Sequence, residues 1–178
     1  SGITGEGYEI AFFGGSFTAV PRPYMLELLN AAQPFLDGKK FTRIRISTRP
    51  DAIDDEVLAI LKDYRVGVIE LGAQSTDNEV LAANLRGHSA QDIFESAEQI
   101  KQTGFELGLQ MMTGLYRSDV QKDLKTADDL LSLKPNCMRV YPTAVFADTL
   151  LEKLWQRGEY VPQTVDKAVD TCFQIFEK

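Results

Sequence analysis

The sequence predicts an α/β fold in which parallel strands alternate with helices. Strand-like apolar runs and segments with helical spacing of their apolar residues follow one another in about five units. Gly, Pro and helix-capping residues separate these units. Strict alternation of strands and helices favours a parallel sheet with right-handed crossovers, either an open doubly wound sheet or part of a barrel.

The composition fits one globular domain over residues 1–178. Hydrophobic residues make up 44% and charged residues 25% of the chain, which is enough for a substantial core. We expect neither a membrane partner nor a signal peptide, because no apolar run approaches the roughly 20 residues of a membrane span. A formal net charge of −7 argues against nucleic-acid binding by this chain alone, since phosphate contacts need clustered Lys and Arg.

The strands are marked by short apolar runs that stop at turn residues. In the first strand the run from Ile10 to Phe13 reaches Gly14 and Gly15, and Pro50 stops the second strand. The expected strands are residues 9–17, 43–49, 67–74, 105–112 and 137–143.

The helices are marked by capping residues at their ends. Pro23 lies near the first turn of the first helix, and Asp54 is placed to cap the second. Ser89 with Asp92 resembles a capping box, and Gly104 ends the helix that follows it. The expected helices are residues 23–36, 54–64, 77–84, 90–103, 119–133, 148–157 and 164–177.

The two faces of the expected sheet differ in polarity, because successive side chains of a strand alternate between faces. A parallel sheet covered by helices on both faces would be apolar throughout, and burying unpaired charge is costly. A curved sheet with a polar concave face, an incomplete TIM-like (β/α) barrel, is therefore favoured over a flat sheet with one exposed face. The apolar set is Ile44, Ile46, Ile69, Leu71, Leu107, Leu109, Met138 and Val140; the polar set is Arg43, Arg45, Ser47, Arg49, Glu70, Gly72, Gln74, Glu106, Gly108, Gln110, Arg139, Tyr141 and Thr143.

Gly14 and Gly15 occupy the carboxyl end of the first strand, where α/β folds and barrels place their ligands. Without Cβ atoms, they let backbone N–H and C=O groups touch a ligand directly. Taken alone, a glycine turn before a helix explains them equally well, so further motifs are needed. Those motifs, each at or just beyond a strand end, are GGSFT (14–18), RISTRPD (45–51), IELGAQS (69–75), RGHS (86–89), LGLQMMTGL (107–115) and RVYPT (139–143), with the tail TLLEKLWQRGEY (149–160).

In this order, the motifs resemble the radical S-adenosylmethionine domain of the Elongator catalytic subunit family. More distantly, they are similar to oxygen-independent coproporphyrinogen III oxidase. The resemblance runs from Tyr8 to Val165. It implies a barrel of the radical S-adenosylmethionine type whose first strand and cluster loop are missing, and hence a fragment of a longer protein.

The resemblance also implies a site for S-adenosylmethionine. The glycine motif would hold the amino group of its methionine moiety, and the remaining positions would face its ribose, carboxylate or sulfonium. Arg86 suits the carboxylate because a guanidinium pairs well with it. In the oxidase branch a Glu and an Asp stand where this chain has Ser47 and Gln110. The implied cofactor-binding residues are Gly14, Gly15, Ser16, Ser47, Gln74, Arg86 and Gln110.

A four-iron, four-sulfur cluster is the second cofactor that the resemblance implies. In the family three cysteines of a CxxxCxxC loop hold it, and iron–sulfur clusters need thiolates. Cys137 and Cys172 have no such neighbours, so the ligands are expected upstream of this chain and none is assigned within it. The two cysteines themselves indicate reduced thiols of a cytoplasmic protein.

The implied function is reductive cleavage of S-adenosylmethionine at the cluster, followed by hydrogen abstraction from a substrate. An Elongator-like role in tRNA modification, with tRNA held through other domains, is one alternative. The others are a coproporphyrinogen oxidase-like oxidoreductase acting on a small molecule and a non-catalytic interaction module without a cluster. An aldolase-like barrel is disfavoured because the strand segments contain no lysine.

Several polar-face residues have structural alternatives. Glu70, Arg45 and Arg139 share one face on three strands, and we expect Glu70 to contact one or both arginines as a structural clamp. For His88, the single histidine, a structural and a substrate-side role both remain open. The pair Met111–Met112 is interpreted as packing.

Overall fold

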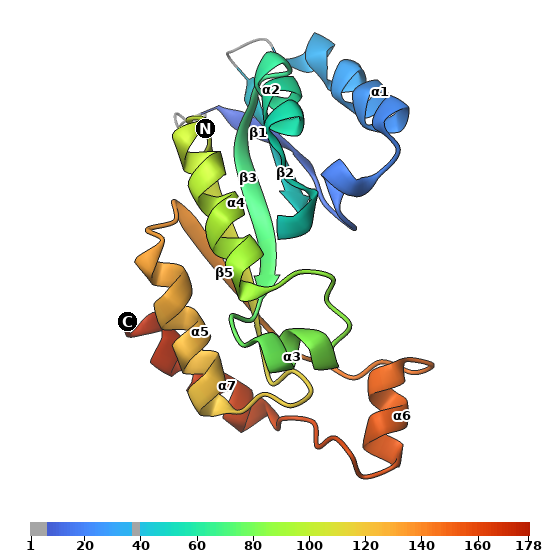
Figure 1. Cartoon of the computed structure of the whole chain (residues 1–178), viewed down its shortest axis with the longest axis vertical. Coiled ribbons are helices and arrows are strands. Elements are labelled where there is room, and N and C mark those ends of the chain that lie inside the picture. The colour runs from blue at the N-terminus through green and yellow to red at the C-terminus, as the bar shows by residue number, and fades with distance from the viewer. Residues whose placement is uncertain (1–6, 37–39) are drawn as a thin grey trace, which may run out of the picture.

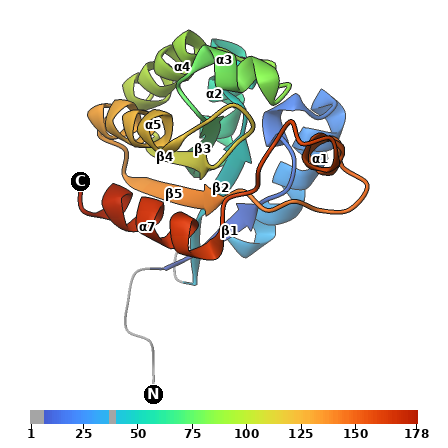
Figure 2. The ribbon, with the colours of Figure 1, turned by 90° about the horizontal axis from the view of Figure 1, so that it is seen from below.

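The fold is centred on a curled parallel sheet whose strands follow sequence order, β1-β2-β3-β4-β5. The computed structural model describes residues 7–36 and 40–178. Figures 1 and 2 show the helices around the outside of the curled sheet. The incomplete barrel expected from the sequence is thereby confirmed. The strands are β1 (Tyr8–Phe12), β2 (Phe41–Thr48), β3 (Val66–Gln74), β4 (Glu106–Thr113) and β5 (Cys137–Pro142).

The helices begin where the capping residues predict. The Asp54 carboxylate accepts a hydrogen bond from the Val57 N–H at 2.7 Å, and Ser89 and Asp92 form a complete capping box. The helices are α1 (Arg22–Ala32), α2 (Asp55–Asp63), α3 (Asn78–Ala83), α4 (Ala90–Gln102), α5 (Val120–Ser132), α6 (Leu150–Gln156) and α7 (Val165–Phe176), with 3₁₀ turns at Phe17–Ala19, Gln33–Phe35 and Pro50–Ala52.

The expected first strand, residues 9–17, is too long and the prediction is wrong at its end. The strand stops at Phe12, because Gly14 and Gly15 take positive φ angles of 92° and 65° and turn the chain out of the sheet. Phe17 then folds back as part of a 3₁₀ turn, and its ring stacks on Phe12 at a centroid distance of 4.9 Å.

The first helix is also shorter than the expected residues 23–36. Its α-helical part ends at Ala32. Pro34 has no N–H to donate to the carbonyl of Asn30, so the chain continues as a 3₁₀ turn over Gln33–Phe35. The other helix ends lie within two residues of the expected ones.

The apolar set lies on the convex side, under the helices, as the alternation predicts. Its members on β2, β3 and β4 are completely buried and belong to one core cluster with α1, α2 and α4 residues such as Met25, Leu61 and Ile100. Burial of this kind is the dominant favourable term in folding. The polar set therefore lines the concave side, which positions the site described next. In the ranges that the structure describes, no helix is long and apolar enough to cross a membrane.

Candidate cofactor-binding site

A hollow of about 480 Å³ lies on the concave face toward the carboxyl ends of the strands. Ligands of parallel α/β sheets bind at this end. Four of the seven residues implied by the resemblance line the hollow, namely Gly14, Gly15, Ser47 and Gln110. Phe13, Arg139 and Tyr141 complete its wall.

Gly14 and Gly15 form the part of the wall that follows β1. A Cβ atom added at either glycine would meet nothing within 4 Å. The two positions therefore require glycine for their left-handed backbone and not for space. Their peptide groups border the hollow without side chains to cover them.

The orientation of the Gln110 side chain is fixed by its neighbours. Its Nε2 donates to Glu70 Oε2 at 2.6 Å and to Ser47 Oγ at 3.2 Å. Both amide hydrogens are thus engaged, and the carbonyl oxygen is the group that Gln110 offers to the hollow. A ligand hydroxyl or N–H is the complementary group.

Ser16, Gln74 and Arg86 do not line the hollow. Ser16 begins the 3₁₀ turn, and its carbonyl accepts a hydrogen bond from the Ala19 N–H at 3.0 Å. Gln74 ends β3 with a left-handed φ of 66°, and its side chain lies over Gly72. Arg86 Nη2 donates to the Gly72 carbonyl at 3.4 Å. Gly72 on β3 pairs with Gln110 on β4. Gln74 and Arg86, which contact Gly72, therefore lie one strand away from the side of the hollow that Gln110 lines.

Arg86 is a half-buried cation that forms no ion pair with a carboxylate of the described residues. Burial lowers the pKa of Arg86, and the charge of Arg49 acts in the same direction. The nearby Asp51 carboxylate is engaged by Arg49 through two hydrogen bonds of 2.7 and 2.6 Å. Within the described ranges no carboxylate forms an ion pair with Arg86. An anionic ligand group would relieve this desolvated charge.

His88 is buried at 5% exposure, and its Nε2 lies 3.1 Å from the Ala73 carbonyl oxygen. Burial is the largest influence on this ring and lowers the pKa of His88. A neutral imidazole that donates Nε2–H to Ala73 fits these contacts. Of the two roles left open by the sequence, the contacts support the structural one.

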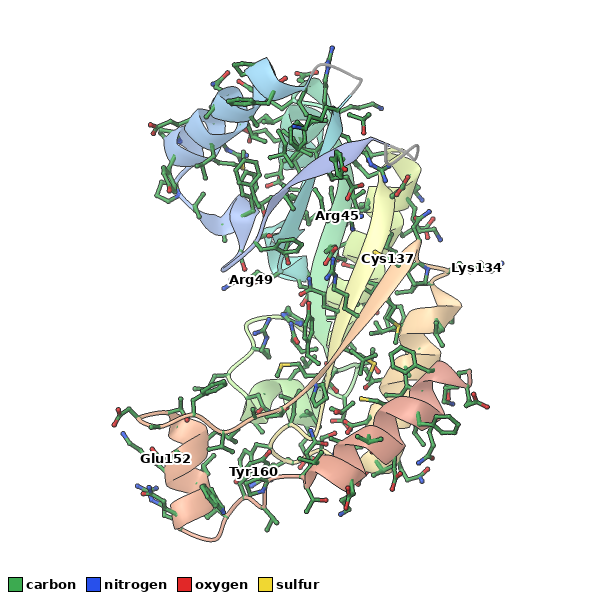
Figure 3. All side chains as sticks on the ribbon, turned by 180° about the vertical axis from the view of Figure 1, so that it is seen from behind. Arg45, Arg49, Lys134, Cys137, Glu152 and Tyr160 are labelled. Carbon is green, nitrogen blue, oxygen red and sulfur yellow. The ribbon has the colours of Figure 1, made fainter. Side chains whose placement is uncertain are left out.

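Glu70 is the centre of the charged network on the concave face, as expected. Its completely buried carboxylate accepts from Arg45 Nη1 at 2.7 Å and pairs with Arg139 Nε at 3.1 Å. The clamp therefore includes both arginines. Figure 3 shows Arg45 and Cys137 over the strands on this side of the sheet.

The network extends toward the amino ends of the strands. Glu9 on β1 accepts from Arg43 Nε at 2.7 Å and from Arg45 Nε at 2.6 Å. Arg43 also pairs with Glu106. We call the set Glu9, Arg43, Arg45, Glu70, Glu106 and Arg139 the charge ladder, because it links all five strands.

Two glycines let the ladder pass over a strand. A Cβ at Gly67 on β3 would lie 2.4 Å from Arg43 Cδ, where Arg43 reaches from β2 to Glu106 on β4. A Cβ at Gly108 on β4 would lie 2.5 Å from Glu70 Cγ, where Glu70 reaches toward Arg139 on β5. Neither position tolerates a side chain without displacement of the ladder.

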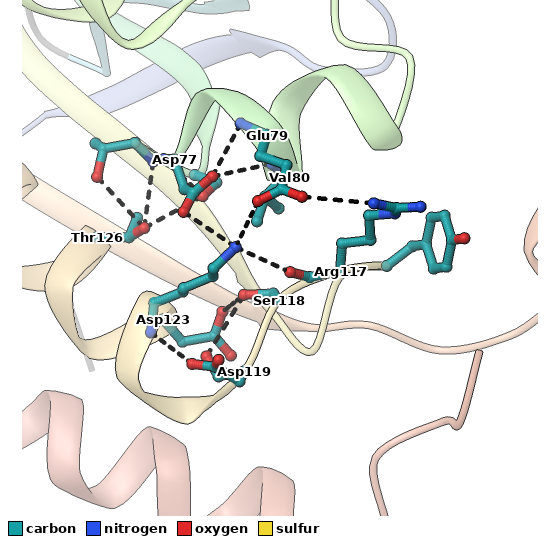
Figure 4. A network of polar contacts seen from close by, with 12 residues as sticks. Asp77, Glu79, Val80, Arg117, Ser118, Asp119, Asp123 and Thr126 are labelled. Carbon is teal, nitrogen blue, oxygen red and sulfur yellow. Dashed lines mark hydrogen bonds and ion pairs between the residues drawn. The ribbon is translucent and has the colours of Figure 1, made fainter. Parts of the chain in front are cut away.

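The loop after β4 is held by a buried carboxylate on α5. Asp123 accepts hydrogen bonds from the Gly114 N–H at 2.9 Å and from Ser118 Oγ at 2.6 Å, and burial raises the pKa of Asp123. Beside it, Lys122 pairs with Asp77 at 3.2 Å at the start of α3 (Figure 4). The loops after β3 and β4, which border the carboxyl end of the sheet, are thus tied to each other.

The cysteines do not form a cluster site. Cys137 lies on the concave face, 3.5 Å from an Arg45 nitrogen, whereas Cys172 lies on α7. In residues 7–36 and 40–178 no group of His, Cys, Asp and Glu side chains is arranged to hold a metal ion. The two cysteines described here therefore do not fit a four-iron, four-sulfur cluster.

Phe13, Arg139 and Tyr141 are site residues that the sequence reasoning missed. The sequence predicts a strand position for Phe13 and a structural clamp for Arg139. The available signal was weak: Phe13 directly precedes the glycines, and Tyr141 shares the polar parity of Arg139.

Comparison with known proteins agrees with this geometry. The model of the Radical SAM superfamily matches residues 3–130, and that of the Radical_SAM C-terminal domain matches residues 135–178. Over 128 residues the chain is 30% identical to the tRNA uridine(34) acetyltransferase of Methanocaldococcus jannaschii, covering 70% of this chain and 24% of the relative. Over 187 residues it is 27% identical to human (Homo sapiens) Elongator complex protein 3, covering 94% and 34%. The chain thus spans about a quarter to a third of the length of these relatives.

Two solved structures share the fold. The archaeal Methanocaldococcus infernus Elp3 superposes with a TM-score of 0.87 at 23% identity, covering 96% of this chain and 45% of that one. Coproporphyrinogen III oxidase from Escherichia coli, a radical SAM enzyme, gives 0.73 at 17% identity, covering 95% and 39%. With the family match over most of its length, the chain belongs to the Radical SAM superfamily.

Proposed function

We propose that residues 1–178 are the S-adenosylmethionine-binding part of a cytoplasmic radical SAM enzyme that modifies tRNA. One observation carries the proposal: Gly14 and Gly15 after β1, Ser47 on β2 and Gln110 on β4 converge on one hollow. Bound at a four-iron, four-sulfur cluster held elsewhere, the cofactor would be cleaved reductively and supply a radical that takes hydrogen from the substrate.

The residues of this chain would bind and orient the cofactor. The peptide groups of Gly14 and Gly15 would meet the amino group of its methionine moiety. The carbonyl oxygen of Gln110, held in place by Glu70, would accept a hydrogen bond from a ribose hydroxyl. Arg86, which lies one strand away from the hollow, would pair with the carboxylate, because no carboxylate of the described residues forms an ion pair with it.

The proposed substrate class follows from the relatives. The curated relatives reported above are a tRNA uridine(34) acetyltransferase and Elongator complex protein 3. The likeness to coproporphyrinogen III oxidase is one of fold at 17% identity and carries no argument for a small-molecule substrate. A net charge of −7 implies that other parts of the enzyme hold most of the tRNA.

Calorimetric titration with S-adenosylmethionine tests the cofactor assignment. Arg86→Gln should weaken binding about tenfold or more, since a hydrogen bond to a charged group contributes about 1.5–3 kcal/mol. Arg157→Gln is the matched control, because Arg157 is exposed at the end of α6, away from the hollow. Equal affinities of the two variants would contradict the assignment.

A further inference from the structure

Three side chains with flat faces share one wall of the hollow. Phe13 is 54% and Tyr141 43% exposed, although both are aromatic. The Arg139 guanidinium carbon lies 5.4 Å from the centroid of the Phe13 ring, in a cation–π contact. We call Phe13, Arg139 and Tyr141 the stacking wall.

The stacking wall joins the two edges of the sheet. Phe13 directly follows β1, while Arg139 and Tyr141 belong to β5. Strands β1 and β5 are the first and last of the sheet, so the curl alone brings these side chains together. The wall thus exists only in the folded half-barrel.

Arg139 is held in place before any ligand arrives. Its Nε lies 3.1 Å from Glu70 Oε2, and its Nη2 donates to Glu70 Oε1 at 3.1 Å. Because Glu70 is completely buried, this side of the guanidinium is anchored in the sheet. A planar ligand therefore meets a prearranged flat surface, and little side-chain freedom is lost on binding.

The charge on the concave face also differs from that of the whole chain. The three arginines of the charge ladder, at positions 43, 45 and 139, balance its three carboxylates, at positions 9, 70 and 106. The face is thus close to neutral although the chain carries −7. Acidic residues are concentrated on the outer helices, so a polyanion is repelled least at the concave side.

We propose that the stacking wall receives an unpaired base of an RNA substrate. This inference rests on the proposed function and names where that substrate meets this chain. Single-stranded bases are recognised by stacking on aromatic rings and on Arg guanidinium planes. The wall is more exposed than Ser47 and Gln110, which form the inner side of the hollow. The substrate base thus enters from the open side, opposite Ser47 and Gln110.

Fluorescence anisotropy with a labelled RNA hairpin that has a uridine-rich loop tests this assignment in the intact enzyme, whose other parts are proposed to hold most of the RNA. Phe13→Leu and Tyr141→Leu keep apolar side chains but remove the rings, and each should weaken RNA binding about tenfold. Tyr141→Phe should retain wild-type affinity, because stacking needs the ring and not the hydroxyl. The same hairpin with abasic loop positions should bind the wild type and the leucine variants equally.

Two exposed aromatic residues away from the hollow provide matched controls. Tyr24 and Phe35 are exposed to 52% and 62%, and they lie on α1 and on the 3₁₀ turn beyond its far end. Tyr24→Leu and Phe35→Leu should leave RNA affinity unchanged. Thermal melting of all variants identifies any loss caused by unfolding.

Titration with S-adenosylmethionine shows whether the stacking wall binds the adenine of the cofactor or a base of the RNA. If the leucine variants lose cofactor affinity and keep RNA affinity, the wall holds the adenine of the cofactor and the RNA assignment is overturned. Unchanged affinity for both ligands overturns it as well. If Arg86→Gln leaves cofactor binding intact while the leucine variants lose RNA binding, the cofactor assignment fails and the RNA assignment stands.

Discussion

The buried carboxylate of Glu70 accepts a hydrogen bond of 2.6 Å from the side-chain amide of Gln110. A charge inside the sheet thus orients a side chain that lines the hollow. The same carboxylate holds Arg45 and Arg139. Glu70 therefore serves stability and site geometry together, and the two roles can be measured separately.

Glu70→Gln should lower the free energy of unfolding by about 3 kcal/mol, at the low end of the range for breaking a buried ion pair. Arg45 keeps Glu9 as a partner, but Arg139 keeps no other carboxylate within the described ranges. Chemical denaturation measures the difference. Glu106→Gln is the control: Glu106 is 41% exposed, so its loss should cost less than about 1 kcal/mol. Equal midpoints for the two variants would contradict the clamp.

Gly108→Ala should destabilise the protein by about 1–3 kcal/mol, because the new methyl group would lie 2.5 Å from Glu70 Cγ. Removing that neighbour should make the methyl group tolerable. The double variant Gly108→Ala with Glu70→Ala should therefore be more stable than the sum of the two single effects predicts. Strict additivity in denaturant titrations would show that Gly108 is required for another reason.

Gly14→Ala should weaken S-adenosylmethionine binding in calorimetric titration. Gly104 provides a close control at the end of α4, because both glycines have a φ of 92° and open space around an added Cβ. The two alanine variants should lose similar stability, about 1–2 kcal/mol for a left-handed alanine. A parallel loss of affinity in Gly104→Ala would argue against a specific role of the Gly14 turn.

Stability should rise with pH in the window just below pH 6.5 because of His88. Burial lowers its pKa from the ordinary value of 6.5, so the unfolded chain binds more protons between the folded pKa and 6.5. The stabilisation is lost as the pH falls through this window. His88→Gln, which retains a donor for Ala73, should flatten the dependence of the urea midpoint on pH, since no other histidine is present. An unchanged slope would show that carboxylates, and not His88, cause the dependence of stability on pH.

Anaerobic reconstitution of this chain with iron and sulfide should give no stable cluster absorption. Its two cysteines lie on β5 and α7, and iron–sulfur clusters need several convergent thiolates. Ultraviolet–visible spectroscopy makes the measurement. A stable cluster band from the chain alone would overturn the view that its ligands lie elsewhere.

The strand faces were predictable because alternation is a local rule. The positions of Glu70, Arg45 and Arg139 on the concave side follow from it directly. The length of the first strand was not predictable by the same rule, since two glycines outweigh the apolar run that precedes them.

The site was predictable only where it depends on single strands. The displacement of Gln74 from the hollow follows from a register shift between Gly72 and Gln74, with Gln74 in the left-handed conformation. Phe13 and Tyr141 line the same hollow because the sheet curls, and the curl depends on every strand at once. No local pattern in the sequence predicts the curl of the sheet.

The charge ladder also limits how the strands can slip during folding. On the convex side, Ile44 and Ile46 are followed along the sheet by Ile69, Leu71, Leu107 and Leu109, so a slip of two residues would still place aliphatic on aliphatic. On the concave side, such a slip would move Gly108 away from Glu70 and set a side chain against it. Correct alignment is thus encoded on the same face that binds ligands. Substitutions on this face that are chosen to alter ligand specificity should therefore cause misaligned strands and aggregation. These effects should be detected before any change in the reaction can be measured.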